Sequence, residues 1–173
     1  LAKIDLAKLK AGVPVELPLP PDYKTTYKTA SGRIEILNNS DAEPLPRYFP
    51  PHGDSARYWL MTAPMPLMLN SSFNERDDLL ANERMTLKMN PADAAKEGLV
   101  DGQRVIAFNE RGEATFYLMV TPQVPAGVVV AEGVWWLRRA PGKRTVNVLT
   151  SQRLTDRGAG STFYDTKVNV RVE

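Results

Sequence analysis

Cysteine is missing from this sequence, and histidine occurs only once. Without cysteine, the chain cannot form a disulfide, a thiolate metal site, an iron–sulfur cluster or a cysteine nucleophile of its own. The single His52 lies in a proline-rich stretch with no partner at metal-ligand spacing, and we interpret it as a surface residue. No Ser-His-Asp set and no carboxylate pair with metal spacing is visible, so we expect no catalysis by this chain alone.

Long apolar runs and a charge excess of one sign are also missing. No stretch approaches the roughly 18 apolar residues of a membrane span, and no signal peptide is visible. The 22 basic and 20 acidic residues are interspersed, so we expect neither a nucleic acid partner nor direct membrane insertion. The chain opens with Leu1, and we expect a piece of a longer polypeptide, in the cytoplasm or the periplasm.

The most regular part of the sequence is the stretch from 86 to 121. An alternating run ends at Asn90, and residues 91–98 predict a short helix, because proline suits the first helical position and glycine the C-terminal stop. Residues 103–109 predict a strand with both faces buried, followed by the second strand of a hairpin at 113–121. These elements cannot bury their own apolar faces, so we expect other strands to complete a small β-barrel.

The remaining elements are predicted from shorter signals. Further strands are expected at 58–62, 128–131 and 167–172, and a short helix at 75–82. Residues 1–10 carry a weak helical pattern, several prolines then exclude helix, and residues 34–37 predict a short strand. We interpret residues 1–52 as an extended arm and linker from a preceding domain, and residues 53–173 as the barrel.

The connection at residues 63–73 contains two prolines, yet it is too apolar for an ordinary solvent loop. Its apolar side chains either plug one end of the barrel or line a cleft. In the second case, the polar residues 70–72 form a floor that can hydrogen-bond a phosphate or a heterocycle. The apolar side chains in question are Met65, Leu67, Met68 and Leu69.

Three later features also allow two interpretations each. Trp135 and Trp136 are adjacent, so at most one lies in the core, and the other packs under a loop or offers a flat wall to a planar ligand. Asn147 lies between valines, where its amide either caps a turn or faces a base edge. Residues 138–144 contain four cations and form a solvated loop or a partner for a ligand phosphate or an acidic neighbouring surface.

The order of these pieces carries a resemblance to a known family. The matching segments are residues 62–73, 89–94, 98–105, 109–112, 125–129, 135–136, 146–150 and 163–165, with 29–36 upstream. Each segment alone is weak, but their order is specific. Together they resemble the C-terminal molybdopterin-dinucleotide-binding domain of the dimethyl sulfoxide reductase superfamily of molybdenum and tungsten oxidoreductases, over residues 59–172.

The resemblance implies a mainly β fold with short helices, namely a six-stranded double-psi β-barrel. It implies a cofactor-binding fragment that holds molybdopterin guanine dinucleotide (Mo-bis-MGD), shared with the parent enzyme's other domains, which supply the metal ligand. Besides those domains, an iron–sulfur electron-transfer subunit is a candidate partner. Tyr164 stands where relatives often carry lysine. The cofactor-binding positions carried over are Thr62, Pro64, Asn70, Ser71, Ser72, Phe73, Trp135, Asn147 and Tyr164.

Two other function classes compete with this interpretation. A stand-alone double-psi barrel could act as a protein-interaction or substrate-recognition module. A barrel hydrolase related to the aspartic proteases would need Asp-Thr-Gly or Asp-Ser-Gly, and neither tripeptide occurs.

Overall fold

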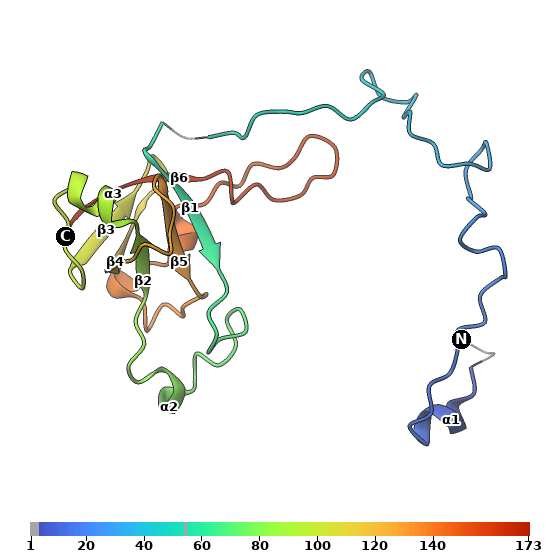
Figure 1. Ribbon diagram of the computed structural model, residues 1–173, viewed down its shortest axis with the longest axis horizontal. Helices are drawn as coiled ribbons and strands as arrows, with labels where there is room; N and C mark the ends of the chain where they lie inside the picture. The colour runs from blue at the N-terminus through green and yellow to red at the C-terminus, as the bar shows by residue number, and fades with distance from the viewer. Residues whose placement is uncertain (1–3, 54) are drawn as a thin grey trace. The chain divides into compact units, whose positions relative to one another are not determined.

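The computed structural model describes residues 4–53 and 55–173 (Figure 1). The chain forms two units, Leu1–Phe49 and Pro50–Glu173. None of the described residues of the first unit is buried, so they form no hydrophobic core.

The first unit contains little regular structure in its described part. Its helix α1 (Leu6–Lys10) begins at Asp5, whose Oδ1 accepts a hydrogen bond of 3.0 Å from the Ala7 backbone N–H. The beginning of the predicted helical stretch, residues 1–3, lies outside the described residues. The strand predicted at 34–37 is wrong, because this segment pairs with no neighbouring strand and its two isoleucines are exposed.

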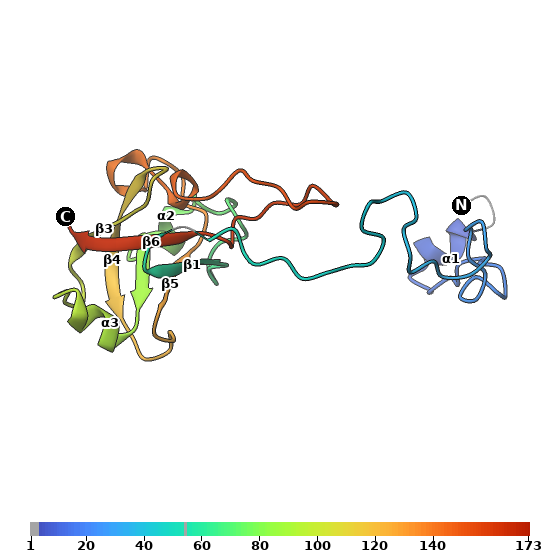
Figure 2. The same cartoon turned by 90° about the horizontal axis from the view of Figure 1, so that it is seen from above.

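The second unit is a closed six-stranded barrel in the order β1-β5-β2-β4-β3-β6 (Figures 1 and 2). The strands are β1 (Tyr58–Ala63), β2 (Thr86–Met89), β3 (Arg104–Phe108), β4 (Glu113–Val120), β5 (Val128–Glu132) and β6 (Lys167–Val172). The pairs β1–β5 and β2–β4 are parallel and the other neighbours are antiparallel. The expected double-psi barrel is confirmed.

The barrel interior is filled by alternate side chains of its strands. Leu60, Leu87, Val105, Phe116 and Val129 come from five different strands and are each fully buried. Burying a side chain of this size stabilises the fold by roughly 1.5–3 kcal/mol. The prediction that β3 is buried on both faces is wrong: its buried positions alternate with half-buried or exposed ones, because an antiparallel barrel strand has an outer face.

One end of the barrel, which we call the closed end, carries short connections. Helix α3 (Pro91–Lys96) follows β2 there, and its N-cap Asn90 accepts a hydrogen bond from the Ala92 N–H at 2.9 Å, as predicted. The buried carboxylate of Asp93 accepts a hydrogen bond of 2.6 Å from the backbone N–H of Gly127. The helix is thereby joined to the turn before β5.

Tyr58 joins the start of β1 to the last turn of the same helix. It is 4% exposed, and its hydroxyl donates a hydrogen bond of 2.7 Å to Oε1 of Glu97, which also pairs with Arg57. The Tyr58 hydrogen bond holds the pKa of Glu97 below its usual range, although partial burial acts in the opposite direction. Burial, together with this bond, raises the pKa of Tyr58 above its ordinary value of 10.0.

The opposite end, which we call the open end, carries the long connections after β1 and β5. These contain three short helical turns: α2 (Asp77–Leu80), η1 (Pro141–Lys143) and η2 (Val146–Val148). The two connections start side by side, because the Gly133 N–H donates to the Ala63 carbonyl at 2.9 Å. The glycine-rich segment before β6 extends from this unit as a long hairpin-like loop (Figure 1).

Candidate cofactor site

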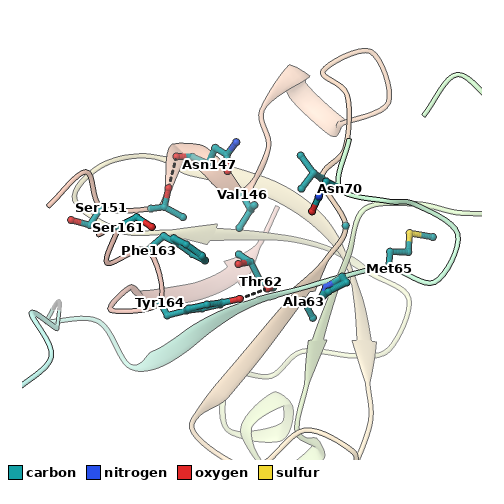
Figure 3. A pocket seen from close by; sticks show the side chains of 14 residues that line it. Thr62, Ala63, Met65, Asn70, Val146, Asn147, Ser151, Ser161, Phe163 and Tyr164 are labelled. Atoms are coloured by element: carbon teal, nitrogen blue, oxygen red, sulfur yellow. Dashed lines mark hydrogen bonds between the residues drawn. The ribbon is translucent and has the colours of Figure 1, made fainter. Parts of the chain in front are cut away.

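A cavity of about 460 Å³ opens among the long connections (Figure 3). Its lining comes from the end of β1 and the following loop, the segment after β5, η2 and the turn after it, and the approach to β6. None of the lining side chains is charged. The lining residues are Thr62, Ala63, Pro64, Met65, Asn70, Gly133, Val134, Val146, Asn147, Thr150, Ser151, Ser161, Phe163 and Tyr164.

Some of the predicted cofactor-binding residues line this cavity, and others lie outside its lining. Those that line it are Thr62, Pro64, Asn70, Asn147 and Tyr164. Those outside its lining are Ser71, Ser72, Phe73 and Trp135. Ser71, Ser72 and Phe73 are exposed beside Asn70, whereas Trp135 is 5% exposed and belongs to the core.

Asn147 presents its side chain on the surface of η2 rather than between two buried valines. Its neighbour Val146 is buried, but Asn147 itself is exposed, and its amide makes no hydrogen bond with the described part of the chain. The alternative in which this amide caps a turn is therefore not what the structure shows. An amide free of internal partners keeps both its donor and its acceptor for a ligand.

The β3–β4 turn is hydrogen-bonded to the end of η2, a contact that the sequence did not predict. The side chains of Asn109 and Arg111 donate to the carbonyl of Leu149 at 2.9 and 2.8 Å. Gly112 lies so close to Val148 that an added Cβ would come within 3.0 Å of the Val148 carbonyl oxygen. The sequence predicts the segment 109–112 as the turn of a hairpin and as part of the family pattern, but not its contacts with η2.

Aromatic residues close the side of the cavity next to β6. The Tyr164 hydroxyl donates to the Thr62 carbonyl at 3.2 Å, and the Phe163 ring lies 4.3 Å from the Tyr164 ring (Figure 3). Phe163 was not among the nominated residues. The adjacent aromatic pair just before the last strand was the signal that could have identified it.

The plug interpretation of the 63–73 loop holds for its two methionines. Of the side chains expected to line a cleft and form its floor, only Met65 and Asn70 line the cavity. Met65 and Met68 are buried and plug the open end, whereas Leu67 and Leu69 are exposed. Gly133 makes this packing possible, because a Cβ there would meet the Met68 Cε at 2.5 Å.

Asn74 joins this loop to the segment after β5, a role that no sequence pattern indicates. Its side chain is fully buried; Oδ1 accepts from the Trp136 N–H at 2.9 Å, and Nδ2 donates to the carbonyls of Val134 and Ser71 at 3.0 and 3.2 Å. Both of these segments form cavity wall. A buried amide with these hydrogen bonds makes the wall a defined surface.

The prediction that only one of the adjacent tryptophans lies in the core is confirmed. Trp135 is buried, and its Nε1 donates to the Glu132 carbonyl at 2.9 Å. Trp136 is 38% exposed, and its Nε1–H donates a hydrogen bond of 2.8 Å to the Ser71 carbonyl. The exposed indole lies outside the cavity lining.

The chemistry of the lining fits a flat, phosphorylated heterocycle. The volume of the cavity lies within the range of about 300–1,000 Å³ that is usual for small-molecule sites. Amides and hydroxyls alternate with apolar side chains, and no carboxylate is present to repel a phosphate. Within residues 4–53 and 55–173, no cluster of three histidine or acidic side chains could hold a metal ion, and no helix is long and apolar enough to cross a membrane.

The closed barrel and its uncharged cavity define the class as a small-molecule-binding domain. Residues 58–167 match the family described as "Molydopterin dinucleotide binding domain". The chain belongs to this family.

Two relatives show how much of a longer protein the chain represents. It is 36% identical over 156 residues to "Probable oxidoreductase YoaE" of Bacillus subtilis, covering 87% of this chain and 23% of that protein. It is 31% identical over 169 residues to "Dimethyl sulfoxide reductase DmsA" of Escherichia coli, covering 82% of this chain and 20% of that protein. The chain therefore spans less than a quarter of either relative.

A solved structure agrees on the fold. Acetylene hydratase from Pelobacter acetylenicus superposes with a TM-score of 0.73 at 14% identity, covering 89% of this chain and 25% of that one. Together, the comparisons confirm the expected family, a molybdopterin-dinucleotide-binding domain, and the barrel fold.

Proposed function

We propose that the cavity at the open end holds one part of the molybdopterin guanine dinucleotide, with Asn147 as its principal polar contact. The observation that carries this assignment is the exposed Asn147 amide, which lines an uncharged cavity and makes no hydrogen bond with the described residues. In this role, the amide donates to and accepts from the edge of a heterocycle.

The other lining residues share the work of binding and orientation. Asn70, Thr62 and the serines of the lining offer amide and hydroxyl groups, while Val146 and Phe163 provide an apolar wall that excludes water. Tyr164 fixes one side through its hydrogen bond to Thr62. The bound cofactor would supply redox chemistry at its metal, and this chain's residues would set its position.

The nominated residues outside the cavity have different proposed roles. Ser71, Ser72 and Phe73 are exposed beside Asn70, so they extend the binding surface beyond the cavity. Trp135 is buried behind the wall and supports it without touching the ligand.

At the level of the whole protein, we propose a molybdenum or tungsten oxidoreductase that acts through domains outside this chain. The printed names of the relatives, an oxidoreductase and a dimethyl sulfoxide reductase, support a redox activity. Residues 1–52 would connect the barrel to a preceding domain, which agrees with the lack of burial in the described part of the first unit. An iron–sulfur electron-transfer subunit is the proposed redox partner.

Replacing Asn147 with alanine in the complete enzyme tests the site assignment. We expect about tenfold weaker cofactor retention, since a polar ligand edge loses its partner. The readouts are the molybdenum content and the released guanine nucleotide per purified polypeptide. Asn82→Ala, an exposed asparagine outside the cavity, is the matched control. Wild-type molybdenum and nucleotide content in the Asn147 variant would overturn the assignment.

A further inference from the structure

A second hollow, of about 620 Å³, lies on the barrel and shares no lining residue with the cofactor cavity. We call it the arginine basin. It is bounded by α2, the segment that leads into β2 and the connection after β5. Its charged and aromatic lining residues are Asp77, Glu83, Arg84, Arg104, Tyr117, Trp135, Arg138 and Arg139.

Two of the basin's arginines are held by carboxylates of the chain. Arg104 pairs with Glu173 at 2.7 Å. Arg139 pairs with Asp77, and its Nε donates to the Asn74 carbonyl at 2.7 Å. These two guanidinium groups therefore serve the structure of the basin itself.

The other two arginines are held by aromatic rings instead. The Arg84 guanidinium lies 4.9 Å from the centroid of the Tyr117 ring, and that of Arg138 lies 4.9 Å from the Trp136 ring. Neither pairs with a carboxylate within the described chain; Arg138 donates one bond, of 3.3 Å, to the Asn74 carbonyl. A guanidinium stacked on a ring keeps its in-plane donors available, in the geometry that binds a carboxylate with two hydrogen bonds.

Exposed apolar side chains lie next to Arg138 in the sequence. Trp136, whose ring lies under Arg138, is 38% exposed, and the next residue, Leu137, is 58% exposed. Arginine beside the exposed Trp136 and the half-buried Tyr117 is the composition that is enriched at the centres of protein interfaces.

We propose that the arginine basin is a docking surface for a partner protein that presents an acidic segment with an apolar side chain. Two carboxylates of that segment would pair with Arg84 and Arg138, and the apolar side chain would cover Trp136 and Leu137. The exposed carboxylate of Glu83 favours a protein over a polyphosphate, since it would repel dense negative charge. The lining of this surface has no residue in common with the lining of the cofactor cavity.

The test measures binding of a fluorescent peptide of alternating glutamate and leucine to the 173-residue chain. We expect the double variant Arg84→Gln with Arg138→Gln to bind it about tenfold more weakly, and each single variant about threefold more weakly. Glu83→Gln should strengthen binding, because it removes a like charge. Arg153→Gln, which removes the same charge from an exposed arginine outside the basin, should leave affinity unchanged.

Further arms of the experiment separate the proposal from simpler explanations. Circular dichroism confirms that each variant is folded. A peptide with lysine in place of glutamate should not bind; equal binding would show that only apolar contact matters. Equal affinity of the double variant and the wild type, or displacement of the peptide by inorganic phosphate at low millimolar concentration, would also overturn the proposal.

Discussion

The two ends of the barrel differ in what their buried polar groups do. At the closed end, Asp93 and Asn90 use their side chains to tie α3 to the neighbouring turns. At the open end, Asn74 is buried in the same way, but it supports the wall of a cavity whose own amide, Asn147, is left exposed. Polar groups that complete their bonds inside the chain stabilise it, and those that do not are available to a ligand.

Among the variants that test this difference between the two ends, Asp93→Ala at the closed end should lower the free energy of unfolding most. The half-buried Gly127 N–H would lose its buried, charged acceptor, which costs about 3 kcal/mol of unfolding free energy. Urea unfolding of the variant and of the wild-type chain measures this change in free energy. Lys96→Ala removes the other partner of Asp93, but that side chain is 69% exposed, so we expect a change below about 0.5 kcal/mol. Equal effects of the two variants would contradict the role assigned to the Asp93–Gly127 bond.

Asn74→Ala should have the next largest effect, and it should be local to the open end. Because the Trp136 N–H and the Val134 carbonyl lose their partner in a buried site, we expect a loss of about 2 kcal/mol. Amide hydrogen exchange should become faster at Trp136 and stay unchanged at Ala92 of the closed end. Glu75→Ala, at the exposed next position, is the control. Unchanged exchange at Trp136 would show that the wall does not depend on Asn74.

The smallest effect concerns the pH dependence of the closed end. The Tyr58 hydroxyl and Arg57 lower the pKa of Glu97 in the folded chain, so their stabilisation is present above the unfolded value of about 4.5 and is lost as the pH falls through the lower folded value. Tyr58→Phe should therefore destabilise the chain by about 1 kcal/mol at pH 7 and by less in acid. Urea unfolding of the wild type and of the Tyr58→Phe variant, at pH 7 and in acid, measures the difference in unfolding free energy. A difference that does not change with pH would contradict the prediction.

The closed end was largely predictable from the sequence because its signals are local. Asn90 and Pro91 mark the start of α3, and Gly98 and Gly102, both with positive φ, mark the turns. The strands at 58–62, 128–131 and 167–172 were also predicted correctly, to within a residue at their ends.

The open end could be predicted only in part, because its cavity depends on contacts between distant segments. Trp135 and Trp136 differ in burial only through what packs on them, and the roles of Asn74 and Asn109 depend on residues some 40 to 60 positions away. The strand at 34–37 failed for the opposite reason: its local pattern was suitable, but no partner strand exists in the described structure.

The order in which the strands pair has a consequence for biosynthesis. Among the strands that the structure describes, β1 pairs only with β5 and β6, the two that come latest in the sequence, and Thr62 meets Tyr164 across a separation of 102 residues. The barrel therefore cannot close on the ribosome until almost all of this segment has been released, and pairing over such separations is slow. Because Thr62 and Tyr164 both line the cavity, its wall is complete only once these distant strands have paired.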